Sequence, residues 1–139
     1  MIGSSAEIAT AVDRILVVDD LPDNYFLLQT VLESEGYIVE VADSGRTALE
    51  SIASHPPDLV LLDVMMPEMN GFEVTRRLRQ NFSLPFIPIL LVTGYSEPTP
   101  ADGFDVGADG FIRKPIDFDY LLDKIRTILQ PRNLIEQQR

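Results

Sequence analysis

Acidic, hydroxyl and ammonium side chains follow four apolar segments of this sequence, where a folded chain could bring them together. In chain order they are Asp19 with Asp20, Asp63, Thr93 and Lys114. Carboxylates held close together raise one another's pKa unless a cation neutralises them. Oxygen ligands without histidine or cysteine favour a hard ion, Mg²⁺ above all. The residues therefore predict a magnesium site beside a lysine and a hydroxyl.

Such a site lacks only a phosphoryl group. Mg²⁺, Lys114 and Thr93 would stabilise charge on that group while one carboxylate attacks the phosphorus. Asp63 is the preferred nucleophile because it stands alone after the expected central strand, whereas the paired Asp19 and Asp20 suit the metal. Each residue by itself also fits a turn, a cap or a strand end. The joint order along the chain is what indicates a site.

The elements that must position these residues alternate between strand and helix five times. Helices are expected to begin at Pro22, Ser44, Asn70 and Asp117, from their start signals and the apolar period that follows each. Residues 96–107 contain two prolines and glycines, so the fourth helix should be short and weak or replaced by an irregular loop.

Repeated strand–helix units indicate a parallel sheet with helices on both faces. The expected strands at 15–18, 59–62 and 87–92 are apolar throughout, so they should be central. The alternating strand at 38–42 and the short strand at 111–113 suit the edges. The predicted fold class is α/β, a flavodoxin-like doubly wound sheet of five parallel strands in the order 2-1-3-4-5. Ligands of such sheets bind at the carboxyl ends of the strands.

Composition excludes several other classes of protein. The 139 residues fit one domain, and we expect a flexible N-terminal extension at 1–13, a domain at 14–130 and a C-terminal tail at 131–139. Cysteine is absent, which excludes disulfides, zinc–thiolate sites and thiol nucleophiles. The single histidine, His55, cannot form a histidine metal site or a conventional triad alone.

Charge and hydropathy restrict the partners and the location. Eleven Lys and Arg against 22 Asp and Glu give a net charge of −11, which argues against direct nucleic-acid binding. No apolar run approaches the ~20 residues of a membrane span, and the first residues do not form a signal peptide. A cytoplasmic protein without membrane contact is the expectation.

With these residues in place, the sequence resembles the receiver domain of response regulators in two-component signal transduction, in particular the chemotaxis-regulator type. The resemblance covers about residues 14–129. The motifs that carry it are Val17-Val18-Asp19-Asp20 with Pro22-Asp23-Asn24, Leu61-Leu62-Asp63-Val64-Met65-Met66-Pro67 with Asn70-Gly71, Val92-Thr93-Gly94, and Gly107-Ala108-Asp109 through Lys114-Pro115.

The resemblance implies that Asp63 accepts a phosphoryl group from a sensor histidine kinase or a phosphotransfer protein. It further implies that Mg²⁺ binds the side chains of Asp20 and Asp63, the backbone carbonyl of Met65, and Asp19 directly or through water. The domain would catalyse only its own phosphorylation and dephosphorylation, and so would be a signalling domain and not an enzyme.

The same resemblance implies a conformational switch. Thr93 would move to the phosphoryl group, followed by inward rotation of Phe111, while Lys114 would pair with a phosphoryl oxygen. The Lys114-Pro115 peptide bond would be cis. The switch would control a downstream effector or an output domain. A homodimer is a further possibility that the sequence does not decide.

Two other functions stay open from the sequence. One is a pseudo-receiver, an interaction module that takes no phosphate. Such modules usually lack one of the acidic residues or the lysine, whereas all five site residues are present here. The other is a Mg²⁺-dependent phosphatase of the haloacid dehalogenase type, which also forms an aspartyl-phosphate. Its Asp-x-Asp pattern is not met, because Met65 occupies the second position after Asp63.

Overall fold

A computed structural model of the chain describes residues 12–94 and 104–137, with side chains as far as residue 130. Strands and helices alternate from the first element to the fourth strand. Their bounds, in chain order, are β1 (Arg14–Val18), α2 (Pro22–Ser34), β2 (Ile38–Ala42), α3 (Gly45–Ser54), β3 (Leu59–Asp63), α4 (Gly71–Gln80), β4 (Ile89–Thr93), β5 (Gly110–Arg113) and α6 (Phe118–Gln137).

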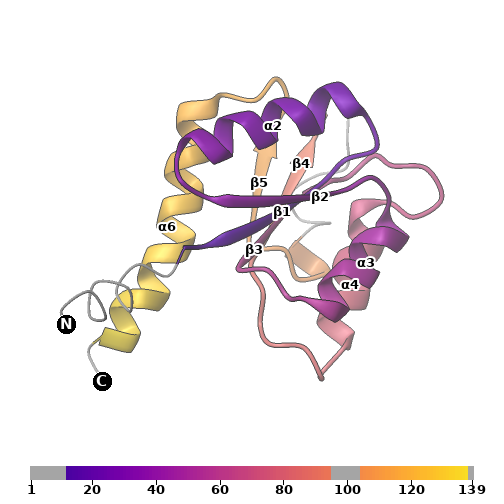
Figure 1. Cartoon of the computed structure of the whole chain (residues 1–139). Helices are drawn as coiled ribbons and strands as arrows, with labels where there is room; N and C mark the ends of the chain where they lie inside the picture. The colour runs from indigo at the N-terminus through magenta and orange to yellow at the C-terminus, as the bar shows by residue number, and fades with distance from the viewer. Residues whose placement is uncertain (1–11, 95–103, 138–139) are drawn as a thin grey trace.

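The five strands form one parallel sheet in the order β2-β1-β3-β4-β5, which confirms the predicted fold class. Helices α2 and α6 cover one face of the sheet, and α3 and α4 cover the other (Figure 1). The strand ends are in register, so that Asp63 pairs with Val92 and Thr93 pairs with Arg113. The carboxyl edge of the sheet therefore collects the residues at the ends of β1, β3, β4 and β5.

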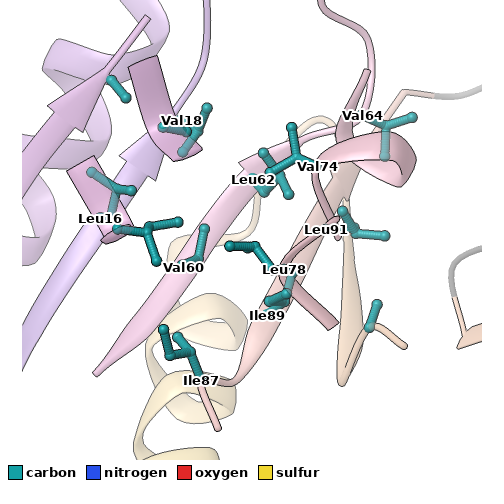
Figure 2. Packing of buried hydrophobic residues seen from close by; sticks show 14 of the residues in the cluster. Leu16, Val18, Val60, Leu62, Val64, Val74, Leu78, Ile87, Ile89 and Leu91 are labelled. Atoms are coloured by element: carbon teal, nitrogen blue, oxygen red, sulfur yellow. The ribbon is translucent and has the colours of Figure 1, made fainter. Parts of the chain in front are cut away.

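Apolar side chains of the central strands fill the core on both faces of the sheet. Successive residues point to opposite faces, so Leu16, Val60 and Leu62 pack with α3 and α4 (Figure 2), whereas Val17 and Leu61 pack with α2 and α6. All of these side chains are buried, and full burial of each contributes about 1.5–3 kcal/mol. Burial on both faces explains why the central strands are continuously apolar.

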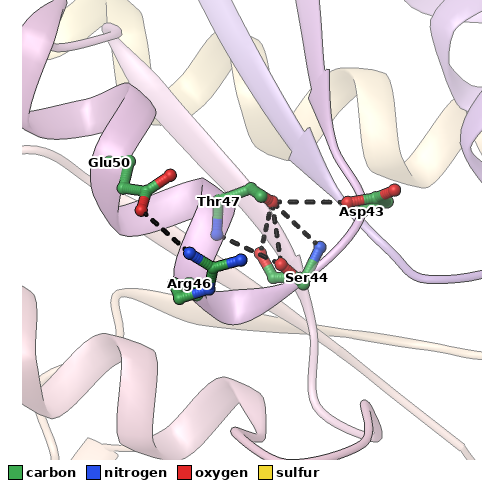
Figure 3. A network of polar contacts seen from close by, with 5 residues as sticks. All are labelled: Asp43, Ser44, Arg46, Thr47 and Glu50. Carbon is green, nitrogen blue, oxygen red and sulfur yellow. Dashed lines mark hydrogen bonds and ion pairs between the residues drawn. The ribbon is translucent and has the colours of Figure 1, made fainter.

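Polar residues fix the start of α3, where the sequence predicts a helix after Ser44. Ser44 Oγ accepts a hydrogen bond from the Thr47 N–H at 3.1 Å, and the Ser44 N–H donates to Thr47 Oγ1 at 3.2 Å. Thr47 Oγ1 also donates to Asp43, and Arg46 pairs with Glu50 one turn along the helix (Figure 3). This reciprocal cap satisfies backbone donors that a helix N-terminus leaves without partners.

The fourth strand differs from the prediction at its start. We expected a strand from Ile87, but β4 begins at Ile89 because Pro88 has no N–H to donate to a neighbouring strand. The Pro88 carbonyl still accepts a hydrogen bond from the Val60 N–H at 3.0 Å. The bounds of the other four strands agree with the prediction to within one residue.

Two further expectations concern the C-terminal helix and the segments outside the sheet. We expected the last helix to give way to a tail at Pro131, but α6 continues to Gln137; a proline removes one intrahelical hydrogen bond and can be passed with a kink. Most of the predicted weak helix or loop at 96–107, and residues 1–11 of the N-terminal extension, lie outside the described residues. The proposed domain boundaries stay predictions.

Within residues 12–94 and 104–137, no helix is both long and apolar enough to cross a membrane.

Arg79, near the end of α4, ties this helix to the segments that lead into β4 and β5. Its guanidinium donates to the carbonyl oxygens of Gly107 and Ile87, at 2.9 and 2.8 Å, and to Asp109 Oδ2 at 2.9 Å. Asp109 Oδ2 also accepts the N–H of the first β4 residue, at 2.8 Å. The guanidinium lies over the ring of Phe86, with 4.6 Å between its carbon and the ring centroid. Arg79 therefore fixes the segment that leads into β5.

Replacing Arg79 should weaken the fold far more than replacing a neighbouring arginine. In Arg79→Met, two part-buried carbonyl oxygens lose their donors, and the free energy of unfolding should fall by about 2–4 kcal/mol. Arg77→Met is the matched control, because Arg77 forms an exposed ion pair with Glu73 and its loss should change stability by less than about 1 kcal/mol. Urea denaturation measures both, and similar losses in the two variants would contradict the assignment.

Candidate functional site

A buried aspartate, Asp19, follows the carboxyl end of β1. Asp19 follows the last residue of β1, and its N–H donates to the Ala42 carbonyl of β2 at 3.2 Å. Its carboxylate is buried and accepts one hydrogen bond from the Leu21 N–H at 3.0 Å. Because β1 is covered on both faces, the chain can place a polar residue here only as it leaves the strand.

Three predicted metal ligands come together at this edge. Asp19, Asp20 and Asp63 each present a carboxylate oxygen, and these oxygens all lie within 4.8 Å of one another. Asp63 is the last residue of β3 and is 4% exposed. A set of carboxylate oxygens this close repels itself in the absence of a cation, and its donor chemistry fits a hard divalent ion. The predicted cluster is therefore present.

Lys114 is the cation that the structure places beside Asp63. Its Nζ lies 3.0 Å from Asp63 Oδ1, and its backbone N–H donates to the Thr93 carbonyl at 2.8 Å. This contact is an ion pair between the Lys114 ammonium group and the buried Asp63 carboxylate. The Lys114-Pro115 peptide bond is cis, as predicted. The end of β5 thus brings an ammonium group to the end of β3.

Thr93 ends β4 with a buried hydroxyl. The residue is 1% exposed, and its Oγ1 has no hydrogen-bond partner in the part of the chain that the structure describes. A buried polar group without a partner costs about 1–3 kcal/mol. Because Asp63 pairs with Val92, Thr93 lies one residue beyond the level of Asp63 on the adjacent strand. Among the described residues the hydroxyl is therefore a donor without a partner at the same edge.

The surroundings of Asp63 raise its pKa from 3.8 to about 6. Removal from water is the largest cause, because it disfavours the charged carboxylate. The hydrogen-bonding and charge contributions of Lys114 lower the pKa and oppose this effect in part, while the charges of Asp19 and Asp20 raise it further. A cation that binds between the carboxylates would favour their charged forms.

The loop after β3 leads from Asp63 to α4. Met65 is in this loop with a side chain that is 60% exposed, and the participation of its backbone carbonyl in metal binding stays a prediction. A Cβ atom on Gly71 would lie 2.6 Å from the Asp63 carbonyl oxygen, so only glycine lets α4 begin this close to the end of β3. The Gly71 N–H donates to the Val64 carbonyl at 2.9 Å. These contacts position the backbone of Asp63.

The predicted switch aromatic, Phe111, lies on β5 and is half-buried against the core on the α3 and α4 side. Its ring meets that of Phe104 edge to face, with 5.3 Å between centroids and 80° between planes. Sequence reasoning did not identify Phe104. The only signal was an aromatic residue shortly before Gly107-Ala108-Asp109, and a single aromatic residue does not specify a contact.

Sequence reasoning also missed an apolar cavity beside the carboxylates. It has a volume of about 320 Å³ and lies between α2 and the turn from β5 to α6. Its wall is mostly apolar and includes Leu27, Leu28, Val92, Ile116 and Phe118, together with Asp19 and Lys114. The cavity arises from residues far apart in the sequence, so no local pattern predicts it.

Comparison with known proteins agrees with this geometry. A family model described as the response regulator receiver domain matches residues 15–126. Response regulator PleD of Caulobacter vibrioides is 40% identical over 127 residues, which cover 91% of this chain and 28% of PleD. Response regulator ArlR of Staphylococcus saprophyticus is 39% identical over 127 residues, which cover 88% of this chain and 56% of ArlR. The chain thus spans between about a quarter and a little over half of these relatives.

Solved structures show the same fold. The chemotaxis protein CheY4 of Vibrio cholerae has a TM-score of 0.78 and 34% identity, with 86% of this chain and 100% of CheY4 covered. The signal receiver domain of a signal transduction histidine kinase from Syntrophus aciditrophicus has a TM-score of 0.79 and 35% identity, with 86% of this chain and 92% of that domain covered.

The raised pKa of Asp63 predicts how stability depends on pH without metal. Between about pH 4 and 6 the folded chain holds a proton that the unfolded chain releases, so the free energy of unfolding should fall as pH rises through this range. Asp63→Asn cannot ionise and should escape this loss, which makes it more stable than the wild type by about 1–3 kcal/mol at pH 7.5.

Urea denaturation in EDTA at pH 4.5 and pH 7.5 measures the effect. The advantage of Asp63→Asn should shrink at pH 4.5. The control is Glu50→Gln on the exposed side of α3, which should change little at either pH. An advantage of Asp63→Asn that does not depend on pH would show that the Asp63 carboxylate is not destabilised by its surroundings.

Proposed function

This chain belongs to the response regulator receiver domain family, and on that basis we propose that Asp63 accepts a phosphoryl group from a sensor histidine kinase or a phosphotransfer protein. The resulting change of conformation controls a downstream effector or an output domain. The observation that carries the proposal is the buried carboxylate of Asp63, which lies within 4.8 Å of two other carboxylates and 3.0 Å from a lysine ammonium group.

The chemistry is a transfer between two side chains. An oxygen of Asp63 attacks the phosphorus of a phosphohistidine on the donor, so a P–O bond forms as the P–N bond breaks and the imidazole leaves. Asp19, Asp20 and Asp63, with the carbonyl of Met65, would hold Mg²⁺. The bound ion supplies positive charge to the phosphoryl oxygens and the carboxylates. Lys114 lies where it can pair with a phosphoryl oxygen and leave its present contact with Asp63.

The switch follows from the new charge. A phosphoryl group adds roughly −1.5 to −2 charge and three acceptor oxygens at the end of β3. The Thr93 hydroxyl, buried on the adjacent strand without a partner in the described structure, can turn its donor to one of these oxygens. Phe111 then rotates inward toward the space that Thr93 leaves. The unpartnered hydroxyl supports this assignment, because its burial cost is recovered in the phosphorylated state.

The alternatives have weaker support. A pseudo-receiver would need none of the phosphoryl chemistry, yet all three carboxylates, the hydroxyl and the lysine are gathered at one edge. A phosphatase with an Asp-x-Asp motif would need a second acid two residues after Asp63, where Met65 is exposed. Turnover of an added phosphomonoester would favour the phosphatase, and binding to a partner without phosphorylation would favour the pseudo-receiver.

Intact mass after incubation with Mg²⁺ and acetyl phosphate tests the proposal. The wild type should gain one phosphoryl group, whereas Asp63→Asn should gain none. Asp58→Asn is the matched control. Asp58 directly precedes β3, at the end of the strand opposite to Asp63, and its carboxylate accepts a hydrogen bond from the Arg14 N–H. A wild type that gains no phosphoryl group, or an Asp63→Asn variant that gains one, would contradict the proposal.

Metal dependence gives a second test. Phosphorylation should stop in excess EDTA and return when excess Mg²⁺ is added. Asp20→Asn should abolish Mg²⁺ binding, because two carboxylates and one carbonyl leave the ion mostly hydrated. Isothermal titration calorimetry with Mg²⁺ measures the binding, with Asp58→Asn again as the control. Normal phosphorylation in EDTA would exclude the metal from the reaction.

A further inference from the structure

Phe104 contacts the aromatic ring of the proposed switch from a segment that the phosphoryl chemistry does not use. The two rings of Phe104 and Phe111 meet edge to face, with centroids 5.3 Å apart and planes at 80°. Such pairs attract because the positive edge of one ring faces the negative face of the other. Phe104 is 52% exposed, so its ring adds little to the core itself.

The turn that follows Phe104 is held in place by Arg79 of α4 through Gly107. The Phe104 carbonyl accepts the Gly107 N–H at 3.0 Å, and the Gly107 carbonyl accepts Arg79 Nε at 2.9 Å. Gly107 has a φ of 104°, a conformation that favours glycine and turns the chain toward β5. The ring of Phe104 therefore projects from an anchored turn onto Phe111.

Phe111 and Thr93 lie on the same face of the sheet. Leu91 pairs with Phe111, and Thr93 pairs with the residue two beyond Phe111, so all three point toward the α3 and α4 side. A movement of Thr93 toward Asp63 thus frees space on the face that Phe111 occupies. Inward rotation of Phe111 into that space would separate its ring from the anchored Phe104.

We propose that Phe104 is a positioning residue for the switch: its ring holds Phe111 in its present half-buried position and so opposes the phosphorylated conformation until a phosphoryl group is present. This inference rests on the proposed function, because it assumes that Asp63 is the phosphoryl site. It adds a residue that sets the equilibrium between the two conformations. A ligand that binds the inward state more tightly gains affinity in proportion to the population of that state.

Beryllofluoride, a mimic of the phosphoryl group, is the probe for this equilibrium. Loss of an aromatic pair corresponds to about a two- to tenfold change in an equilibrium constant. Phe104→Ala should therefore bind beryllofluoride about two- to tenfold more tightly than the wild type in the presence of Mg²⁺, as measured by calorimetry on the full chain. Phe104→Tyr keeps the ring, with its hydroxyl free to reach solvent, and should restore the wild-type affinity.

Phe82→Ala is the matched control. Phe82 is 94% exposed in the loop between α4 and β4, and it should leave the affinity unchanged. A double-mutant cycle then isolates the pair: in a Phe111→Ala background, Phe104→Ala should have no effect on the affinity. A structural role for Phe104 alone would lower stability without this dependence on Phe111.

The outcomes separate this inference from the function on which it rests. If the wild type neither binds beryllofluoride nor gains a phosphoryl group from acetyl phosphate, both are wrong. If it does both, but Phe104→Ala binds beryllofluoride with unchanged or weaker affinity, only the positioning role is overturned. An equal gain in affinity in Phe82→Ala, or a gain that persists in the Phe111→Ala background, would overturn it as well.

Discussion

The mutual repulsion of three carboxylates at the end of a buried sheet is the constraint on which this site depends. Asp63 is held away from water at the end of β3, and the charges of Asp19 and Asp20 are close enough to add to the cost of ionising it. Lys114 offsets this cost only in part, since the pKa of Asp63 remains at about 6. The folded chain thus carries an electrostatic imbalance that a divalent cation can relieve.

The same edge of the sheet also has an unmatched hydrogen-bond donor. The Thr93 hydroxyl is a buried donor without a partner in the described structure, whereas the carboxylates are acceptors in excess. A phosphoryl group on Asp63 would add acceptor oxygens within reach of the hydroxyl and of the Lys114 ammonium group. The site is therefore less stable than an apolar one would be, and under the proposed function this cost would favour a change of conformation on phosphorylation.

The rest of the fold supplies rigidity around these imbalances. The central strands are buried on both faces, Gly71 lets α4 approach the backbone of Asp63, and Arg79 anchors the turn before β5. The ring of Phe104 extends from that anchored turn to Phe111, on the same face of the sheet as Thr93. Rigid parts thus surround the few side chains to which the proposed switch assigns two positions. The relatives PleD and ArlR extend well beyond the length of this chain.

Local patterns determined much of this protein. Continuous apolar runs specify strands buried on both faces, and the strand order follows from which runs are apolar throughout. Asp19, Asp63 and Thr93 could be placed together because residues at the ends of parallel strands must share one edge. Tertiary structure decided the rest: the raised pKa of Asp63, the lack of a partner for the Thr93 hydroxyl among the described residues, and the contact between Phe104 and Phe111. Each depends on distances between residues far apart in the chain, and burial and charge act through space, so no spacing along the sequence could encode them.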